Sequence, residues 1–237
     1  MSNDQNERTY IVVGGSSGIG HEIVGELLQQ GAKVHVWSRS TPTKFNELPN
    51  IHSNVDITKD IKDIDLPEQL DGLVYCPGSI QLGQFKRLSP DIFREDFELN
   101  LIGAVRVLQY TEKLLRANGG GSVVLFSTVA VQTGLAFHAS VAAAKGAVEG
   151  LVRSLASEYS RQKVRFNCIA PSATDTPLAA HVIGSEKQKA ASASSHPLQR
   201  IGTAKDIAAG ALYLLSPESD WVTGQVLHID GGISSLR

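Results

Sequence analysis

The sequence is poor in cysteine and has no long apolar run, and each shortage excludes a class of protein. Its two cysteines, Cys76 and Cys168, lie apart in short apolar runs, which fits reduced thiols better than a disulfide framework or a metal site. No apolar stretch approaches the roughly 20 residues that a membrane-spanning helix needs. The first ten residues, MSNDQNERTY, are polar and contain no apolar core of an export signal. We therefore predict a soluble cytoplasmic protein with no bound metal and no membrane partner.

A strong excess of charge of either sign is also missing. The chain has 22 lysines and arginines against 24 aspartates and glutamates, so its formal net charge is -2. Proteins that bind nucleic acid or acidic membranes carry a basic excess. We therefore predict no nucleic-acid partner. The 42% hydrophobic and 19% charged content of the 237 residues is that of an ordinary globular protein.

Short apolar runs alternate with longer segments of helical spacing along nearly the whole chain. We predict buried strands at Tyr10–Val13, Lys33–Trp37, Gly72–Cys76, Ser122–Phe126, Val164–Ala170 and Val226–Ile229, with a further short strand at Ile51–Asn54. We predict helices at His21–Gln30, Asp91–Asn118, Ala139–Arg161 and Ala204–Leu215. This alternation indicates an α/β protein with a parallel sheet covered by helices on both faces. Because no internal repeat or long linker interrupts it, we predict a single domain over residues 1–237.

Two segments break this regular pattern. Asp56–Leu70 has little helical spacing, so any helix in it is expected to be short. Asp175–Gly202 is rich in alanine, serine and histidine and is interrupted by Pro177 and Pro197. Connections of that length are often lids or binding loops, so we predict a mobile substrate lid at residues 175–202.

The first predicted strand leads directly into the glycine-rich sequence VGGSSGIG and then into a helix. Glycines let the backbone approach a phosphate closely, and a helix N-terminus offers unpaired N–H groups and a positive dipole end. A sharp strand-to-helix turn without a ligand is the simpler alternative. We predict cofactor contacts from Gly14, Ser16, Ser17, Gly18, Ile19 and Gly20.

The end of the second predicted strand distinguishes between the two nicotinamide dinucleotides. A carboxylate there would bind the ribose hydroxyl of NAD(H), whereas this chain has Ser38, Arg39 and Ser40 and no acid. A guanidinium between two hydroxyl groups suits a 2'-phosphate, so we predict that NADP(H) is favoured over NAD(H). The alternative is a solvated surface arginine. Asp56 is a candidate for the adenine amino group, or for a cap on the next turn.

Several motifs together resemble the short-chain dehydrogenase/reductase family. They are the glycine spacing, NLIG from Asn100, AAAKGAVEGLVRSLASEY, VRFNCIAPSATDTPL and the tail HPLQRIGTAKDIAAGALYLLSPESDWVTGQVLHIDGG. The match runs in the family's order from about Tyr10 to Ile233. The resemblance implies a doubly wound Rossmann-type sheet of about seven strands, a nicotinamide dinucleotide site, a small-molecule substrate and a homodimer or homotetramer.

The resemblance also assigns roles to single residues. It places Asn100 where the family holds a proton-relay water, and Lys145 where a lysine binds the nicotinamide ribose and lowers the pKa of a tyrosine. It places further cofactor contacts at Gly14, Gly18, Gly20, Asp56, Gly78, Pro171 and Thr176.

Two positions depart from the family's pattern. The family's tyrosine lies four residues before its lysine, and here that position is Val141. The family's serine position is Thr128, while the adjacent Ser127 is expected to point the other way because side chains alternate along an extended segment. The usual proton donor is therefore missing.

A positioned general acid contributes about a hundredfold to ten-thousandfold to a rate, so its loss matters. Thr128 can still offer a hydroxyl, and Lys145 is expected to bind ribose and to be a second candidate acid. His138, three residues before Val141, is a candidate substitute, or a histidine with no chemical role. Weaker candidates for the same task, each with a plainer structural explanation, are Tyr75, His181 and His196.

Three functions are compatible with these residues. The first is an NADP(H)-dependent oxidoreductase for a carbonyl or alcohol, with atypical or impaired catalysis. The second is a catalytically silent nucleotide-binding subunit that pairs with an active relative. The third is a non-redox enzyme, such as a dehydratase, on the same fold. The fold alone does not distinguish these three functions. We favour the first, because the residues predicted to bind the cofactor are retained.

Overall fold

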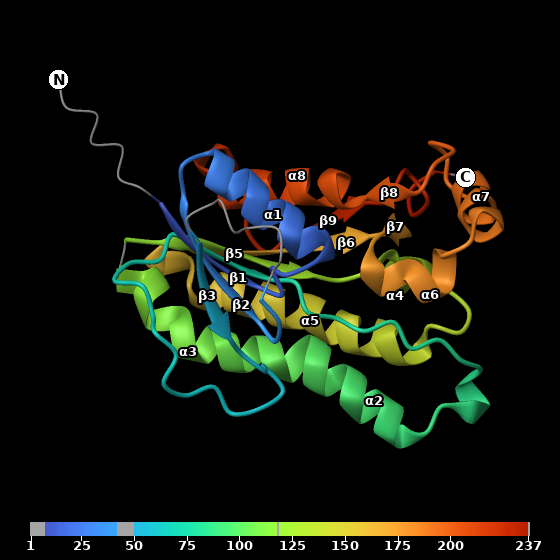
Figure 1. Cartoon of the computed structure of the whole chain (residues 1–237), viewed down its shortest axis with the longest axis horizontal. Helices are drawn as coiled ribbons and strands as arrows, with labels where there is room; N and C mark the ends of the chain where they lie inside the picture. Colours follow the sequence, from blue (N-terminus) through green and yellow to red (C-terminus); the bar gives the residue numbers. More distant parts are fainter. Residues whose placement is uncertain (1–7, 42–49, 118, 237) are drawn as a thin grey trace.

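A seven-stranded sheet runs through the centre of the structure, in the order β3-β2-β1-β4-β5-β6-β9 with every neighbouring pair parallel (Figure 1). The computed structural model describes residues 8–41, 50–117 and 119–236. The strands are β1 Thr9–Val13, β2 Lys33–Ser38, β3 Asn50–Asn54, β4 Gly72–Tyr75, β5 Gly121–Phe126, β6 Val164–Pro171 and β9 Val226–Ile229. Two short strands, β7 Thr174–Asp175 and β8 Gly202–Thr203, pair separately.

Helices cover both faces of the sheet (Figure 1). One face carries α1 Gly18–Gln29 and α8 Ala204–Leu215. The other carries α2 Pro90–Phe97, α3 Gly103–Ala117 and α5 Ala139–Glu158, and a π-helix, Glu98–Ile102, joins α2 to α3. The short helices are α4 Val129–Thr133, α6 Ala180–Ile183 and α7 Glu186–Ser194, with 3-10 turns at Phe85–Arg87, Ser160–Gln162, Pro177–Ala179 and Pro217–Ser219. The architecture is therefore the doubly wound Rossmann-type fold expected from the sequence.

Strand β1 shows why its sequence is apolar throughout. Ile11 and Val13 belong to the core cluster beneath α3 and α5, whereas Tyr10 and Val12 belong to the cluster beneath α1 and α8. Successive side chains of a strand point to opposite faces, so a strand covered on both faces buries every residue.

The predicted strands are confirmed to within one residue at each end; β4, for example, ends at Tyr75 rather than Cys76. The predicted helix Asp91–Asn118 is wrong as a continuous α-helix, because the π-helix interrupts it; Asn118 lies outside the described residues. At the interruption the Asn100 side chain donates to the Asp96 carbonyl, a contact of the kind that widens a helix. Residues 175–202 contain the helices α6 and α7 rather than an open loop throughout, and their predicted mobility as a lid stays a prediction.

Gly103 is expected to be sensitive to substitution. A Cβ added there would lie 2.4 Å from the Tyr75 hydroxyl and 2.6 Å from Cδ1 of Ile57, so Gly103→Ala should lower the free energy of unfolding by about 1–3 kcal/mol. A Cβ added at Gly25, in α1, would meet no atom within 4 Å outside its own stretch of helix, so Gly25→Ala should raise the free energy of unfolding by about 0.5–1 kcal/mol. Urea unfolding measures the free energy of unfolding of both variants. An equal change in the two variants would contradict the packing explanation.

Candidate active site

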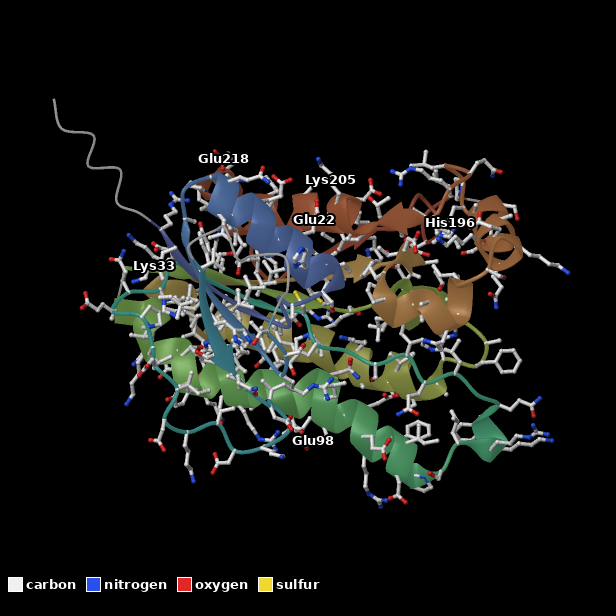
Figure 2. All side chains as sticks on the ribbon, viewed as in Figure 1. Glu22, Lys33, Glu98, His196, Lys205 and Glu218 are labelled. Atoms are coloured by element: carbon white, nitrogen blue, oxygen red, sulfur yellow. The ribbon has the colours of Figure 1, made fainter. Side chains whose placement is uncertain are left out.

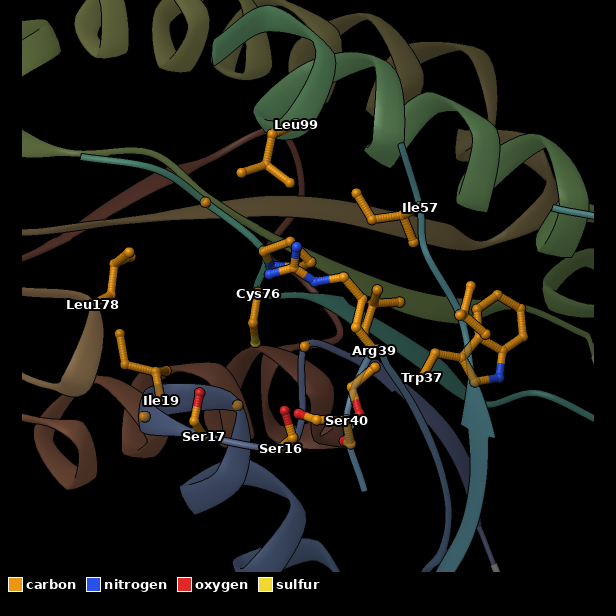
Figure 3. Close-up of a pocket in the computed structure, with 18 of the residues that line it drawn as sticks. Ser16, Ser17, Ile19, Trp37, Arg39, Ser40, Ile57, Cys76, Leu99 and Leu178 are labelled. Carbon is orange, nitrogen blue, oxygen red and sulfur yellow. Dashed lines mark hydrogen bonds between the residues drawn. The ribbon is translucent and has the colours of Figure 1, made fainter. Parts of the chain in front are cut away.

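A cavity of about 360 Å³ opens at the carboxyl ends of β1, β2 and β4 (Figure 3). In doubly wound sheets this is the edge at which ligands bind, where the strand order reverses. The cavity is lined by residues 13–14, 16–20, 37–40, 55–58, 76–78, 99 and 176–178. Of the predicted cofactor residues, those in its lining are Gly14, Ser16, Ser17, Gly18, Ile19, Gly20, Ser38, Arg39, Asp56, Gly78 and Thr176.

The glycine loop forms one wall of this cavity. Gly14 has φ +76°, a conformation that L side chains rarely adopt, and an added Cβ at Gly20 would lie 2.4 Å from the Gly14 carbonyl oxygen. Helix α1 begins at Gly18, so its unpaired N–H groups and positive dipole end lie at the cavity. The loop therefore forms a cradle that suits the pyrophosphate of a dinucleotide.

The end of β2 forms another wall of this cavity. Arg39 is exposed and points into the cavity, between Ile57 and Cys76 in the view of Figure 3. The Ser38 hydroxyl donates to the Ser40 carbonyl oxygen at 2.8 Å and lies 3.0 Å from Nε2 of His52. Arg39 thus lines the cavity with its side chain directed into it, while the Ser38 hydroxyl is engaged within the protein.

Asp56 lies beside Arg39 in the same wall. Its Oδ1 accepts hydrogen bonds from the backbone N–H of Thr58 at 3.1 Å and from the Thr58 hydroxyl at 2.7 Å. These bonds, with a smaller contribution from the Lys59 and Arg39 charges, hold the pKa of the Asp56 carboxyl below its ordinary value. Asp56 therefore caps a turn and also lines the cavity, so both sequence interpretations of this residue stay open.

Lys145 and Asn100 approach the cavity from behind Gly78. A Cβ added at Gly78 would lie 3.3 Å from the Asn100 Oδ1 and 3.5 Å from the Lys145 Nζ. The Lys145 side chain comes from α5 and is only 7% exposed. Burial lowers its pKa from 10.5 to about 8. A cation with this pKa can both bind a ribose and exchange a proton near neutral pH.

The Asn100 side chain is anchored by two residues that the sequence did not single out. Its Nδ2 donates to the Ser79 hydroxyl and to the Asp96 carbonyl oxygen, both at 2.8 Å. The Ser79 hydroxyl in turn donates to a carboxylate oxygen of Asp96. The available signal was the four-residue spacing of Asp96 and Asn100, which places both side chains on one helix face.

The residues predicted for proton delivery lie outside the cavity lining. Val141 is 5% exposed and sits one turn before Lys145 on α5. Thr128 caps α4, with its Oγ1 accepting from the Ala130 N–H, and it still has a hydroxyl proton to donate. Ser127 points away as expected, since its hydroxyl donates to the Glu149 carboxylate at 2.7 Å.

The histidines and Tyr75 have partners elsewhere. Nδ1 of His138 lies 2.7 Å from the Ala136 carbonyl oxygen. Nε2 of His181 lies 3.1 Å from the Ile80 carbonyl oxygen. His196, labelled in Figure 2, is buried and contacts the Ser172 hydroxyl at 2.8 Å in a second, smaller cavity. The Tyr75 hydroxyl donates to the Leu99 carbonyl oxygen, and burial raises its pKa, so this tyrosine belongs to the core.

Within the described ranges, no helix is both long and apolar enough to cross a membrane. Across those same residues, no three histidine, cysteine or acidic side chains are grouped so that they could hold a metal ion.

Five of the predicted site residues lie outside the lining of the 360 Å³ cavity. They are Asn100, Thr128, His138, Lys145 and Pro171, the last of which ends β6.

Comparison with known proteins identifies relatives over almost the whole chain. A family model described as enoyl-(acyl carrier protein) reductase matches residues 13–234. A tropinone reductase homologue of Arabidopsis thaliana is 31% identical over 244 residues, which cover 95% of this chain and 90% of the relative.

Solved structures agree with this match. A short-chain type dehydrogenase/reductase from Mycobacterium ulcerans is 30% identical with a TM-score of 0.86, covering 97% of this chain and 90% of that one. A structure of ElxO with NADP bound is 25% identical with a TM-score of 0.87, covering 97% and 99%. Sequence, fold and the glycine-loop cavity therefore agree that this chain belongs to the short-chain dehydrogenase/reductase family of oxidoreductases.

Proposed function

We propose that this chain is an NADP(H)-dependent oxidoreductase that interconverts a small-molecule carbonyl and its alcohol. The observation that carries the choice of cofactor is Arg39, which points into the cavity where the end of β2 has no carboxylate. A guanidinium binds a 2'-phosphate with charge-assisted hydrogen bonds, whereas NAD(H) offers it only a hydroxyl. The NADP-bound structure of the relative ElxO supports the same cofactor class.

Most of the proposed cofactor contacts line the cavity, and Lys145 and Pro171 lie outside its lining. The N-terminus of α1 and the glycine loop would hold the pyrophosphate, with Arg39 at the adenosine ribose, Asp56 at the adenine and Lys145 at the nicotinamide ribose. The remaining proposed contacts are Ser38, Gly78, Pro171 and Thr176.

When bound, the reduced nicotinamide supplies a hydride; this chain's residues must supply the proton. If Val141 stands at the family's tyrosine position, no phenol donates to the substrate oxygen, so proton delivery is expected to be slow. The Thr128 hydroxyl would donate a hydrogen bond to that oxygen, and Lys145, with a pKa near 8, would transfer a proton from Nζ. His138 is the further candidate acid.

Residues 175–202 are proposed to cover the substrate. The segment includes Thr176 and Leu178, which line the cavity, and His181, which contacts the Ile80 carbonyl oxygen across the chain.

The protein is also proposed to assemble with copies of itself. Light scattering is expected to give the molar mass of a homodimer or homotetramer.

Calorimetric titration of the natural protein tests the cofactor. NADPH is expected to bind about tenfold or more tightly than NADH, because its phosphate adds a charge-assisted hydrogen bond. Equal affinities would overturn the preference, and the absence of binding by both would overturn the proposed function itself.

A further inference from the structure

Asp96 differs from the other acids of its helix in being fully buried. It is 0% exposed, whereas Asp91 and Glu95 on the same α2 are exposed. Its Oδ1 accepts from the Ser79 hydroxyl, while its Oδ2 is buried with no hydrogen-bond partner among the described residues. Burying a carboxylate costs several kcal/mol unless a charge or donors compensate, so a nearby cation is expected.

That cation is Lys145, on the α5 helix against which α2 packs. Three titratable groups act on the Lys145 charge: Cys76 after β4, Cys168 in β6 and Asp96 in α2. Burial raises the pKa of both thiols to about 12, so at neutral pH they carry no charge. Among these three groups Asp96 is the carboxyl, and its effect raises the pKa of Lys145, although burial lowers that pKa more strongly.

Asn100 connects the two groups geometrically. Its Nδ2 must face the Asp96 carbonyl oxygen, because that oxygen can only accept a hydrogen bond. The amide orientation is thereby set, and Oδ1 faces Gly78, the same point that the Lys145 Nζ approaches. Ser79 strengthens the arrangement by accepting from Nδ2 and donating to Asp96.

We propose that Asp96 is a positioning residue for Lys145. Its buried carboxylate favours the cationic form of the lysine at the cofactor cavity, and with Ser79 it holds Asn100 so that Oδ1 faces that cation. Val141 offers Lys145 no hydroxyl group as a partner. Asp96 and Asn100 would supply part of the polar surroundings that such a hydroxyl would otherwise give the lysine. This proposal rests on the function proposed above in one respect, namely the identity of the group that Lys145 binds.

The test is the titration of Lys145 in the protein without cofactor, followed by NMR of labelled lysine side chains and assigned with Lys145→Arg. A negative charge raises the pKa of a nearby ammonium, so Asp96→Asn should lower the titration midpoint of Lys145. Glu95→Gln is the matched control, because it removes the same charge from the next, exposed position and should leave the midpoint unchanged. An unchanged midpoint in Asp96→Asn would overturn the proposal.

Ser79→Ala provides a second variant if Asp96→Asn does not fold. It removes the hydroxyl that donates to Asp96 and accepts from Asn100, so the Asn100 side chain is held less firmly and the Lys145 midpoint should fall in the same direction by a smaller amount. A midpoint that stays fixed in this variant would equally contradict the role of Asp96. Because no cofactor is present in the titration, a failure of NADPH to bind would overturn the proposed function and leave this result intact.

Discussion

A Val141→Tyr variant is expected to reduce carbonyl compounds with NADPH about a hundredfold to ten-thousandfold faster than the natural chain, the usual contribution of a positioned general acid. Position 141 lies one turn before Lys145 on α5, so a tyrosine there would share a helix face with the ammonium. The Lys145 charge would lower the pKa of the new phenol and aid proton transfer. Valine can donate neither a proton nor a hydrogen bond.

The measurement is the rate of NADPH oxidation over a panel of aldehydes and ketones. Val141→Phe is the matched control, because it adds the same ring without the hydroxyl and should give no gain. A gain in both variants would show that the shape of the pocket matters rather than the proton. If Val141→Tyr reduces no compound faster than the natural chain does, the assignment of position 141 fails.

Replacing Arg39 by alanine is expected to weaken NADPH binding by about tenfold to a hundredfold while leaving NADH binding unchanged. Hydrogen bonds to charged groups contribute about 1.5–3 kcal/mol, and only NADPH has the phosphate to receive them. Asp56 supplies the neighbouring negative charge, so loss of Arg39 would also leave a carboxylate facing the phosphate. Calorimetric titration of both cofactors measures the difference.

Lys33→Ala is the control for that substitution. Lys33 begins β2 and Arg39 follows its end, so the two variants remove equal charge from opposite ends of one strand. An equal loss of NADPH affinity in both variants would show only a general effect of net charge. A parallel loss of NADH affinity in Arg39→Ala would indicate damage to the cavity wall rather than loss of a phosphate contact.

The alternation of apolar runs predicted the sheet because parallel strands covered on both faces must be apolar throughout. Tyr10–Val13 illustrates this, since its side chains divide between two cores but all are buried. The glycine loop was also recognisable, because a tight turn and a close phosphate approach both require residues without a Cβ, at fixed spacing. These features depend on neighbours in the sequence.

Asp96 and Ser79 show what depends on the tertiary structure. In the sequence Asp96 looks like a surface acid of a charged segment, FREDFE, and Ser79 looks like a loop residue. Only the packing of α2 on α5 buries Asp96, and only the path of the chain after β4 brings Ser79 to it from 17 positions away. The sequence by itself determined the strands, most of the helices and the glycine loop, since periodicity and glycine spacing are local. The tertiary structure decided which polar side chains surround Lys145, because burial and charge pairing depend on segments that meet only in the folded chain.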